Sequence, residues 1–296
     1  MTFLASSRLG LGTAPLGNLY TEVSEEDAAA TVDAAWTAGI RVFDTAPLYG
    51  HGLAERRVGC ALASRPRDAY VLSTKVGRVL VAGTPDPSSG FRVSHAEVAR
   101  FDFSADGVRR SLDESLARLG LDRVDVALIH DPDDHLEQAI TEAAPALARL
   151  REEGVVRAIG FGMNHVEPLV EAVERCDLDV ILVAGRYTLL DQAALDSGLF
   201  ARCAVRGVAV MAGGVFNSGV LAAPSPASTY DYRLVDDDRL GRARAIAELC
   251  AAHGTTLAAA ALQLVIAQPS VRTVLIGARA AGEIEGDVRM AAAPID

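Results

Sequence analysis

Four side chains that can exchange or stabilise a proton stand at the ends of apolar runs or shortly after one. Asp44 and Lys75 each end such a run, His130 ends a third, and Tyr49 follows Asp44 by five residues. The chain has 27 arginines but a single lysine, Lys75, which indicates a position where arginine fails. Lysine is a compact point charge with an adjustable pKa, whereas arginine is a wide planar fork.

Together these groups predict acid–base chemistry. A tyrosine pKa is ordinarily about 10, and we expect the Lys75 ammonium to lower the pKa of Tyr49 by favouring its phenolate. Asp44 would hold Lys75 in place, and His130 would orient a substrate oxygen. Such a group suits carbonyl reduction or alcohol oxidation. Taken singly, Asp44 could be a loop cap, and Tyr49 and His130 could be packing or structural residues.

Eight short apolar runs are the elements that must position these side chains. Most are continuously apolar, as expected for strands of a parallel sheet buried on both faces. The predicted strands are Arg8–Thr13, Arg41–Thr45, Tyr70–Val76, Val124–His130, Val155–Phe161, Val180–Ala184, Val208–Ala212 and Thr273–Ile276.

Amphipathic segments alternate with these runs. Val108, Leu112, Leu116 and Leu119 fall on one helix face, and Ser24 with Asp27 is typical of a capping box. Glycines follow the helical segments, where a left-handed residue ends a helix: Gly39, Gly120, Gly154, Gly207 and Gly254.

This alternation predicts an α/β protein, a (β/α)8 TIM barrel forming a single domain over residues 1–296. The rival fold is a doubly wound Rossmann sheet, but Pro15 replaces the third glycine of its G-x-G-x-x-G fingerprint. In a barrel the carboxyl ends of the strands meet at one mouth. Asp44, Lys75 and His130 would therefore converge there.

Composition narrows the class of partner. The 296 residues are 50% hydrophobic and carry a formal charge of −11, which argues against nucleic acid or an anionic membrane as a partner. The absence of a long apolar run and of a signal-like N-terminus indicates a cytoplasmic protein. The cysteines Cys60, Cys176, Cys203 and Cys250 are expected to be reduced and buried. The sequence does not predict an oligomeric state.

Three motifs resemble the aldo-keto reductase superfamily over nearly the whole chain. They are Phe43-Asp-Thr-Ala-Pro-Leu-Tyr-Gly50, Ser73-Thr-Lys75, and Ser115-Leu-Ala-Arg-Leu-Gly120 followed by Asp125–His130. The resemblance implies a catalytic tetrad of Asp44, Tyr49, Lys75 and His130, with Tyr49 as general acid/base. It also implies a nicotinamide cofactor bound extended across the barrel mouth.

Further motifs resemble a branch of that family that oxidises a cyclic hemiacetal to a lactone with NAD. These motifs lie at Tyr49–Arg57, Lys75–Arg78 and His130–Asp134. The substrate implied is a small sugar, an aldose such as L-fucose. Pyridoxal oxidation and broad aldehyde reduction are the alternatives. His51 and Arg78 could contact sugar hydroxyls or could be exposed loop residues.

The resemblance also implies a set of cofactor-binding residues: Gly12, Thr13, Asn164, Gly277, Ala278, Arg279, Glu283 and Asp287. NADP-using relatives place basic residues after the last strand, where this chain has Gly277 and Glu283. A carboxylate repels a 2′-phosphate and can accept a hydrogen bond from a free 2′-hydroxyl, which favours NAD over NADP. Arg279 argues the other way.

The chain departs from the family pattern in several places. Met163 replaces a usual serine and Ala184 a frequent glutamine, so the nicotinamide would lose two partners. The aromatic residue that stacks on the nicotinamide is replaced within Ala212–Phe216, and Phe216 or Tyr187 could take its place. The end of the chain at Asp296 suggests a shorter tail and a more open substrate pocket.

Two rival functions remain. His130–His135 is rich in potential metal ligands, but the chain has no H-x-H pair and its other ligand types are scattered, so no metal site is predicted. A non-enzymatic subunit that senses a cofactor and regulates a partner is the other rival. The intact tetrad argues against it.

Overall fold

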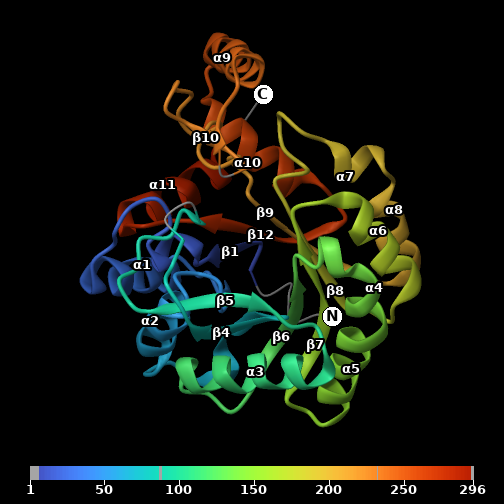
Figure 1. Cartoon of the computed structure of the whole chain (residues 1–296). Helices are drawn as coiled ribbons and strands as arrows, with labels where there is room; N and C mark the ends of the chain where they lie inside the picture. The colour runs from blue at the N-terminus through green and yellow to red at the C-terminus, as the bar shows by residue number, and fades with distance from the viewer. Residues whose placement is uncertain (1–6, 87–88, 232, 295–296) are drawn as a thin grey trace.

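A closed barrel of eight parallel strands forms the centre of the molecule (Figure 1). The computed structural model describes residues 7–86, 89–231 and 233–294. Around the barrel, the strands run in the order β1 (Leu9–Gly12), β12 (Val271–Gly277), β9 (Ala209–Gly213), β8 (Val180–Ala184), β7 (Val156–Met163), β6 (Val124–His130), β3 (Val71–Val76) and β2 (Val42–Asp44). All eight predicted strands are confirmed, within two residues at each end, and the Rossmann alternative is excluded.

The register of the strands brings the functional residues to one edge. Gly12 of β1 pairs with Asp44 of β2, and Asp44 pairs with Ser73 of β3. Lys75 of β3 in turn pairs with Leu128 of β6, two residues before His130. The parallel strands therefore present Asp44, Lys75 and His130 at the same mouth.

Helices follow the strands and surround the barrel. They are α1 (Glu25–Thr37), α2 (Leu53–Leu62), α3 (Ala105–Leu119), α4 (Leu136–Gln138), α5 (Ala144–Glu152), α6 (Val166–Arg175), α7 (Ala193–Asp196), α8 (Leu199–Arg206), α9 (Asp237–Ala252), α10 (Leu257–Ala267) and α11 (Ala281–Ala292). The Ser24 side chain accepts a hydrogen bond from the Asp27 amide and caps α1, as predicted. The five predicted helix-ending glycines all have positive φ.

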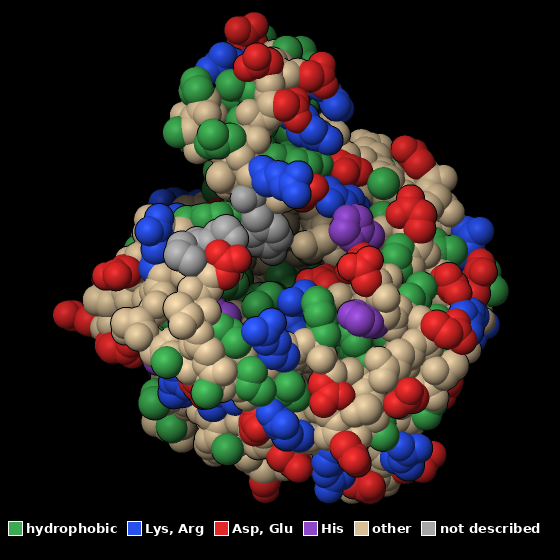
Figure 2. Space-filling model, viewed as in Figure 1, with side chains coloured by type: hydrophobic (Ala, Val, Ile, Leu, Met, Phe, Trp, Pro, Cys, Tyr) green, Lys and Arg blue, Asp and Glu red, His purple; other side chains and the backbone are tan. Residues whose placement is uncertain are grey.

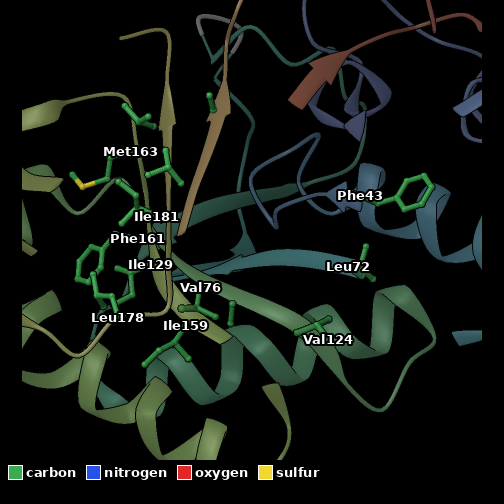
Figure 3. Close-up of a cluster of buried hydrophobic side chains, with 14 of the residues drawn as sticks. Phe43, Leu72, Val76, Val124, Ile129, Ile159, Phe161, Met163, Leu178 and Ile181 are labelled. Atoms are coloured by element: carbon green, nitrogen blue, oxygen red, sulfur yellow. The ribbon is translucent and has the colours of Figure 1, made fainter. Parts of the chain in front are cut away.

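Two layers of apolar side chains hold the barrel together. Inside it, residues such as Val126, Leu128 and Met211 form a small cluster that fills the interior. Outside it, a much larger cluster packs the strands against the helices, including the predicted α3 face. Figure 3 shows part of this outer layer, with Ile129, Phe161 and Ile181 projecting from neighbouring strands. The alternation explains why the strands read as continuously apolar.

Two hairpins lie outside the barrel and were not predicted. β4 (Arg78–Ala82) pairs antiparallel with β5 (Glu97–Phe101), directly after the strand that carries Lys75. β10 (Thr229–Tyr230) pairs with β11 (Arg233–Leu234) beside the lobe of α9 that projects at the top of Figure 1. A separate apolar cluster that includes Val220, Leu240 and Leu257 fixes this lobe.

Two further findings concern possible membrane-spanning helices and the cysteines. Within the described ranges no helix alone is long and apolar enough to cross a bilayer; α9 and α10 pass that test only as a pair bent by 92°. The four cysteines are free, and three are buried. Cys60 is exposed, contrary to expectation, because it lies on the outer face of α2.

Candidate active site

Lys75 and Asp44 form a buried ion pair at the mouth of the barrel. Lys75 Nζ lies 2.6 Å from Asp44 Oδ2, and the two side chains are 1% and 3% exposed. Nζ also donates to the Thr45 carbonyl oxygen at 2.9 Å. Burial alone would lower the pKa of Lys75, but the negative charges of Asp44 and of an ionised Tyr49 outweigh it and raise that pKa. Lys75 is therefore a fixed positive charge.

Tyr49 lies over this charge, on the turn between β2 and α2. Lys75 Nζ is 4.7 Å from the centre of the Tyr49 ring, and the His130 ring meets the Tyr49 ring edge-to-face at 5.9 Å. The turn packs against Gly17 so closely that a Cβ on Gly17 would lie 2.6 Å from the Tyr49 carbonyl carbon. Glycine at that position is therefore needed to place Tyr49.

The pKa of Tyr49 shifts in the direction opposite to the one expected. Burial of the ring disfavours the phenolate and raises the pKa above 10, while the Lys75 charge lowers it by less. Phe91 contributes to that burial, with its ring 6.3 Å from the Tyr49 ring. Tyr49 is therefore a protonated phenol at neutral pH, ready to donate.

His130 is a buried, neutral imidazole. Burial lowers its pKa well below 6.5, and the positive charges of Arg78 and Lys75 lower it further. Nε2 lies 3.4 Å from Asp131 Oδ2, and Nδ1 has no hydrogen-bond partner among the described residues. Arg78 binds the same Asp131 oxygen at 3.1 Å.

A second buried group supports the strand that carries Lys75, and sequence reasoning missed it. Glu55, on α2, is fully buried. Its Oε1 accepts a hydrogen bond from Thr74 Oγ1 at 2.7 Å, and its Oε2 pairs with Arg118 Nε at 2.6 Å. The Arg118 partner lies on α3, so three elements are locked together immediately beside Lys75. The available signal was the place of Glu55 within Tyr49–Arg57, one of the motifs quoted above.

His51 and the β4–β5 connection form a wall of the site. His51 is only 4% exposed, packs against Phe91 and has two ring nitrogens without described partners. It is thus a buried residue rather than an exposed loop residue. His95 Nε2 lies 3.1 Å from the His51 carbonyl oxygen and ties the wall to the turn. The face in Figure 2 is hollowed near its middle, with charged and histidine side chains around the hollow.

Two glycines stand at the ends of β1 and β12, where the sequence predicts part of the cofactor site. Gly12 pairs with Gly277 across these strands, and a Cβ on Gly277 would meet Pro15 at 3.2 Å. Thr13 is fully buried, and its hydroxyl and backbone amide both donate to the Asp44 carbonyl oxygen at 2.9 Å. Thr13 therefore positions Asp44 as well as lining the mouth.

The turn after β12 has features that fit a dinucleotide. Arg279 Nε is buried without a partner among the described residues, which suits an anionic group. Glu283 Oε2 accepts a hydrogen bond from the Arg279 amide at 2.7 Å. Ala278 is fully buried, so only its backbone can meet a ligand, and Asp287 lies one helical turn after Glu283 with 7% exposure.

The remaining predicted cofactor contacts lie at the ends of β7 to β9. Asn164 follows β7, and its carbonyl oxygen accepts a 2.6 Å hydrogen bond from Arg186 Nε. Asn217, which the sequence analysis did not single out, donates from its amide nitrogen to the Gly185 carbonyl oxygen at 3.1 Å, and its Oδ1 is buried without a partner among the described residues. Tyr187 packs edge-on against Phe200 in the core, whereas Phe216 is half-buried after β9. Between these two, Phe216 is the available aromatic ring.

The ligand-rich segment His130–His135 does not gather into a metal centre. Among the residues with described positions, no three histidine, cysteine or acidic side chains lie close enough to hold an ion. Asp133 instead pairs with His165 Nδ1 at 2.5 Å.

Comparison with known proteins finds a family and several relatives that match nearly the whole chain. The sequence pattern of the Aldo/keto reductase family matches residues 8–296. D-threo-aldose 1-dehydrogenase of Pseudomonas sp is 42% identical, with 99% of this chain and 91% of that protein covered. Pyridoxal 4-dehydrogenase of Microbacterium luteolum is 39% identical (97% and 90% covered), and L-galactose dehydrogenase of Arabidopsis thaliana is 32% identical (97% and 85% covered).

A solved structure shares the whole fold. Glycerol dehydrogenase from Gluconobacter oxydans superposes with a TM-score of 0.78 at 26% identity, covering 98% of this chain and 88% of that one. The match of the family pattern spans nearly every residue of this chain, and three relatives exceed 30% identity along almost their full length. The chain therefore belongs to the aldo/keto reductase family of oxidoreductases, which use nicotinamide cofactors.

Proposed function

We propose that this oxidoreductase oxidises the anomeric hydroxyl of a small aldose, such as L-fucose, to a lactone with NAD. The observation that carries the proposal is the buried Lys75–Asp44 pair beneath the Tyr49 ring. A fixed ammonium there stabilises the phenolate form of Tyr49, which accepts the proton of the substrate hydroxyl in oxidation. The similarity to D-threo-aldose 1-dehydrogenase supports an aldose as substrate. A reaction that draws on a nicotinamide pool suits the cytoplasm, the location we propose.

Each member of the tetrad has a separate task in this scheme. Tyr49 takes the proton of the substrate hydroxyl in oxidation and returns it in reduction. Lys75 stabilises the charge on Tyr49, and Asp44 holds Lys75. Neutral His130 orients the substrate oxygen through a hydrogen bond. The nicotinamide, when bound, supplies the site that accepts the hydride.

The residues proposed to hold the cofactor are Gly12, Thr13, Asn164, Gly277, Ala278, Arg279, Glu283 and Asp287. We propose NAD rather than NADP because the Glu283 carboxylate lies next to the Arg279 amide and opposes a 2′-phosphate. Glu283→Gln keeps the side-chain shape and the hydrogen bond but removes the charge. We expect it to reduce the NAD:NADP ratio of kcat/KM; an unchanged ratio would contradict this role of Glu283.

The test of the function is Tyr49→Phe, assayed with L-fucose and NAD. We expect turnover to fall by at least about 1,000-fold, in the upper part of the range for a lost acid/base group, while the Kd of NAD stays within about twofold. Tyr70→Phe is the matched control, because Tyr70 is also buried but lies directly before β3, at the other end of that strand from Lys75. Near-full activity of Tyr49→Phe would refute the assignment of Tyr49.

Substrate comparison separates the finer alternatives. Purified protein is assayed with L-fucose, pyridoxal and a simple aldehyde, each with NAD(H) and NADP(H). A preference for pyridoxal would follow the 39% relative instead, and a preference for aldehyde with NADPH would indicate a broad reductase. Tight cofactor binding without turnover on any substrate would favour a regulatory subunit.

A further inference from the structure

Asp131 is a charged residue next to His130 that has no role in the tetrad. Its Oδ2 lies 3.4 Å from His130 Nε2 and 3.1 Å from Arg78 Nη2. Its backbone has a φ of +43°, a left-handed conformation that costs energy for residues other than glycine, asparagine and aspartate. Its amide donates to the Gly162 carbonyl oxygen of β7 at 3.1 Å. The chain therefore holds this carboxylate against His130 through backbone geometry.

The position of this carboxylate decides which ring nitrogen of His130 carries the hydrogen. A neutral imidazole has one donor nitrogen and one acceptor nitrogen. A hydrogen on Nδ1 would leave a buried donor unpaired and turn the Nε2 lone pair toward a negative charge. A hydrogen on Nε2 avoids both penalties. At 3.4 Å the contact is longer than an ordinary N–H···O bond, so this hydrogen stays available to a substrate oxygen.

Arg78 orients Asp131 and favours its charged form. The guanidinium carbon of Arg78 lies 4.4 Å from the centre of the Phe101 ring of β5. Nη2 of the same guanidinium lies 3.1 Å from Asp131 Oδ2. Burial raises the pKa of Asp131 above its ordinary value, and the charges of Arg78 and Lys75 offset only part of that rise, to which Asp133 adds. The β4–β5 hairpin, which supplies Arg78 and Phe101, thereby reaches His130 through Asp131.

We propose that Asp131, held by Arg78, is a positioning residue that fixes His130 as the Nε2–H tautomer facing the substrate oxygen. This proposal rests on the proposed function, because it assigns the hydrogen bond that His130 gives to the substrate. It accounts for the left-handed backbone at Asp131 and for the carboxylate shared between Arg78 and His130.

The test is Asp131→Asn, with Asp134→Asn as the matched control. Asparagine tolerates a left-handed backbone as well as aspartate does, so the loop is preserved. Asp134 is an exposed carboxylate in the same loop, so its variant makes the same change of charge. Long-range ¹H–¹⁵N spectra of the labelled full chain with NAD report the tautomer. The His130 signals are assigned by their loss in His130→Gln.

We expect the parent and Asp134→Asn to show His130 protonated at Nε2. In Asp131→Asn the new amide can donate to Nε2, so the signals should move toward the Nδ1–H form. The kcat should fall about 10- to 100-fold, as when an orienting partner of a histidine is lost, with the KM for NAD unchanged. An unchanged Nε2–H signature in Asp131→Asn would overturn the proposal. The spectra report the tautomer of His130 without any turnover of substrate. A failure of this proposal can therefore be told apart from a failure of the proposed function, which would show as activity retained in Tyr49→Phe.

Discussion

The Nζ atom of Lys75 lies 2.6 Å from the Oδ2 atom of Asp44 inside the barrel mouth, and neither side chain is more than 3% exposed. A buried charge without its partner is strongly destabilising. A variant that removes only one of these two charges should therefore be less stable than a variant that removes both. The same contact explains why the single lysine of the chain was not replaced by arginine, because the planar fork of arginine would displace the Tyr49 ring that lies 4.7 Å from Nζ.

Separating this pair should affect stability and activity differently. We expect Lys75→Met to lower the free energy of unfolding by about 3–5 kcal/mol, because Asp44 is left buried and charged. The double variant Lys75→Met with Asp44→Asn should recover a large part of that loss yet remain inactive. Chemical denaturation of the parent, both single variants and the double variant measures the coupling. Additive losses would show that the two charges do not stabilise each other.

Lys75→Arg separates charge from shape at the same position. It keeps the positive charge, but the wider side chain cannot occupy the space beneath Tyr49. We expect kcat to fall at least about 100-fold, because a misplacement near 1 Å has that effect on catalysis. Steady-state kinetics of the folded variant tests this, and a mild effect would contradict the explanation of the lone lysine.

The raised pKa of Tyr49 predicts different pH profiles for oxidation and reduction. In the proposed reaction, oxidation needs the deprotonated form of Tyr49. Because the pKa of Tyr49 lies above 10, this form is a small fraction of the enzyme near neutral pH, and that fraction grows about tenfold per pH unit. We therefore expect the kcat of oxidation to rise about tenfold per pH unit through neutral pH. Reduction needs the protonated form and should stay flat over the same range. Rates measured from pH 6 to 10 in both directions test this. A plateau of oxidation below pH 8 would indicate a phenol with a lowered pKa.

The barrel and the convergence of the four residues were predictable from local sequence. The predicted strands Val124–His130 and Val180–Ala184, which are largely apolar, match the observed strands residue for residue. The reason is that a parallel barrel strand is buried on both faces, which leaves an unambiguous pattern. Asp44, Lys75 and His130 then had to meet, because each stands at the carboxyl end of a strand.

What the sequence did not predict depends on contacts between distant segments. The β4–β5 hairpin joins Arg78 to Phe101 across a long connection, so no short turn motif marks it. This hairpin and its connection bring Phe91 onto Tyr49, and burial of the ring reverses the expected direction of the pKa shift. Asp131 was visible in the sequence, but only its backbone geometry directs it toward His130.

The contact of Gly17 with the Tyr49 turn predicts a remote effect on catalysis. A methyl group on Gly17 would lie 2.6 Å from the Tyr49 carbonyl carbon, so Gly17→Ala must push the turn away from β1. We expect kcat to fall at least about tenfold, because the displaced turn moves the Tyr49 hydroxyl away from the position it needs for catalysis. Gly241→Ala in α9 is the control, since no atom of the described residues outside the helix backbone would lie within 4 Å of the new methyl group, and it should stabilise the protein by up to about 1 kcal/mol. Equal behaviour of the two variants would contradict the steric argument.

Asp287 should make the protein less stable as the pH rises. Burial and the negative charge of Glu283 raise the pKa of Asp287 to about 7 from an ordinary 3.8. Between these values the folded state binds the proton and the unfolded state does not, so the free energy of unfolding falls as the pH rises toward 7 and levels off above it. Asp287→Asn removes that loss, because the amide stays neutral in both states.

The variant should therefore gain on the parent as the pH increases. The rise from 3.8 to about 7 is about three pKa units, each worth about 1.4 kcal/mol, so we expect Asp287→Asn to gain up to about 4 kcal/mol on the parent at pH 8 and to converge with it near pH 4. Urea denaturation at several pH values measures the difference. Glu285→Gln is the control, because Glu285 is exposed on the same helix and should give a nearly constant offset. A gain that does not grow with pH would mean that Asp287 is not the group being titrated.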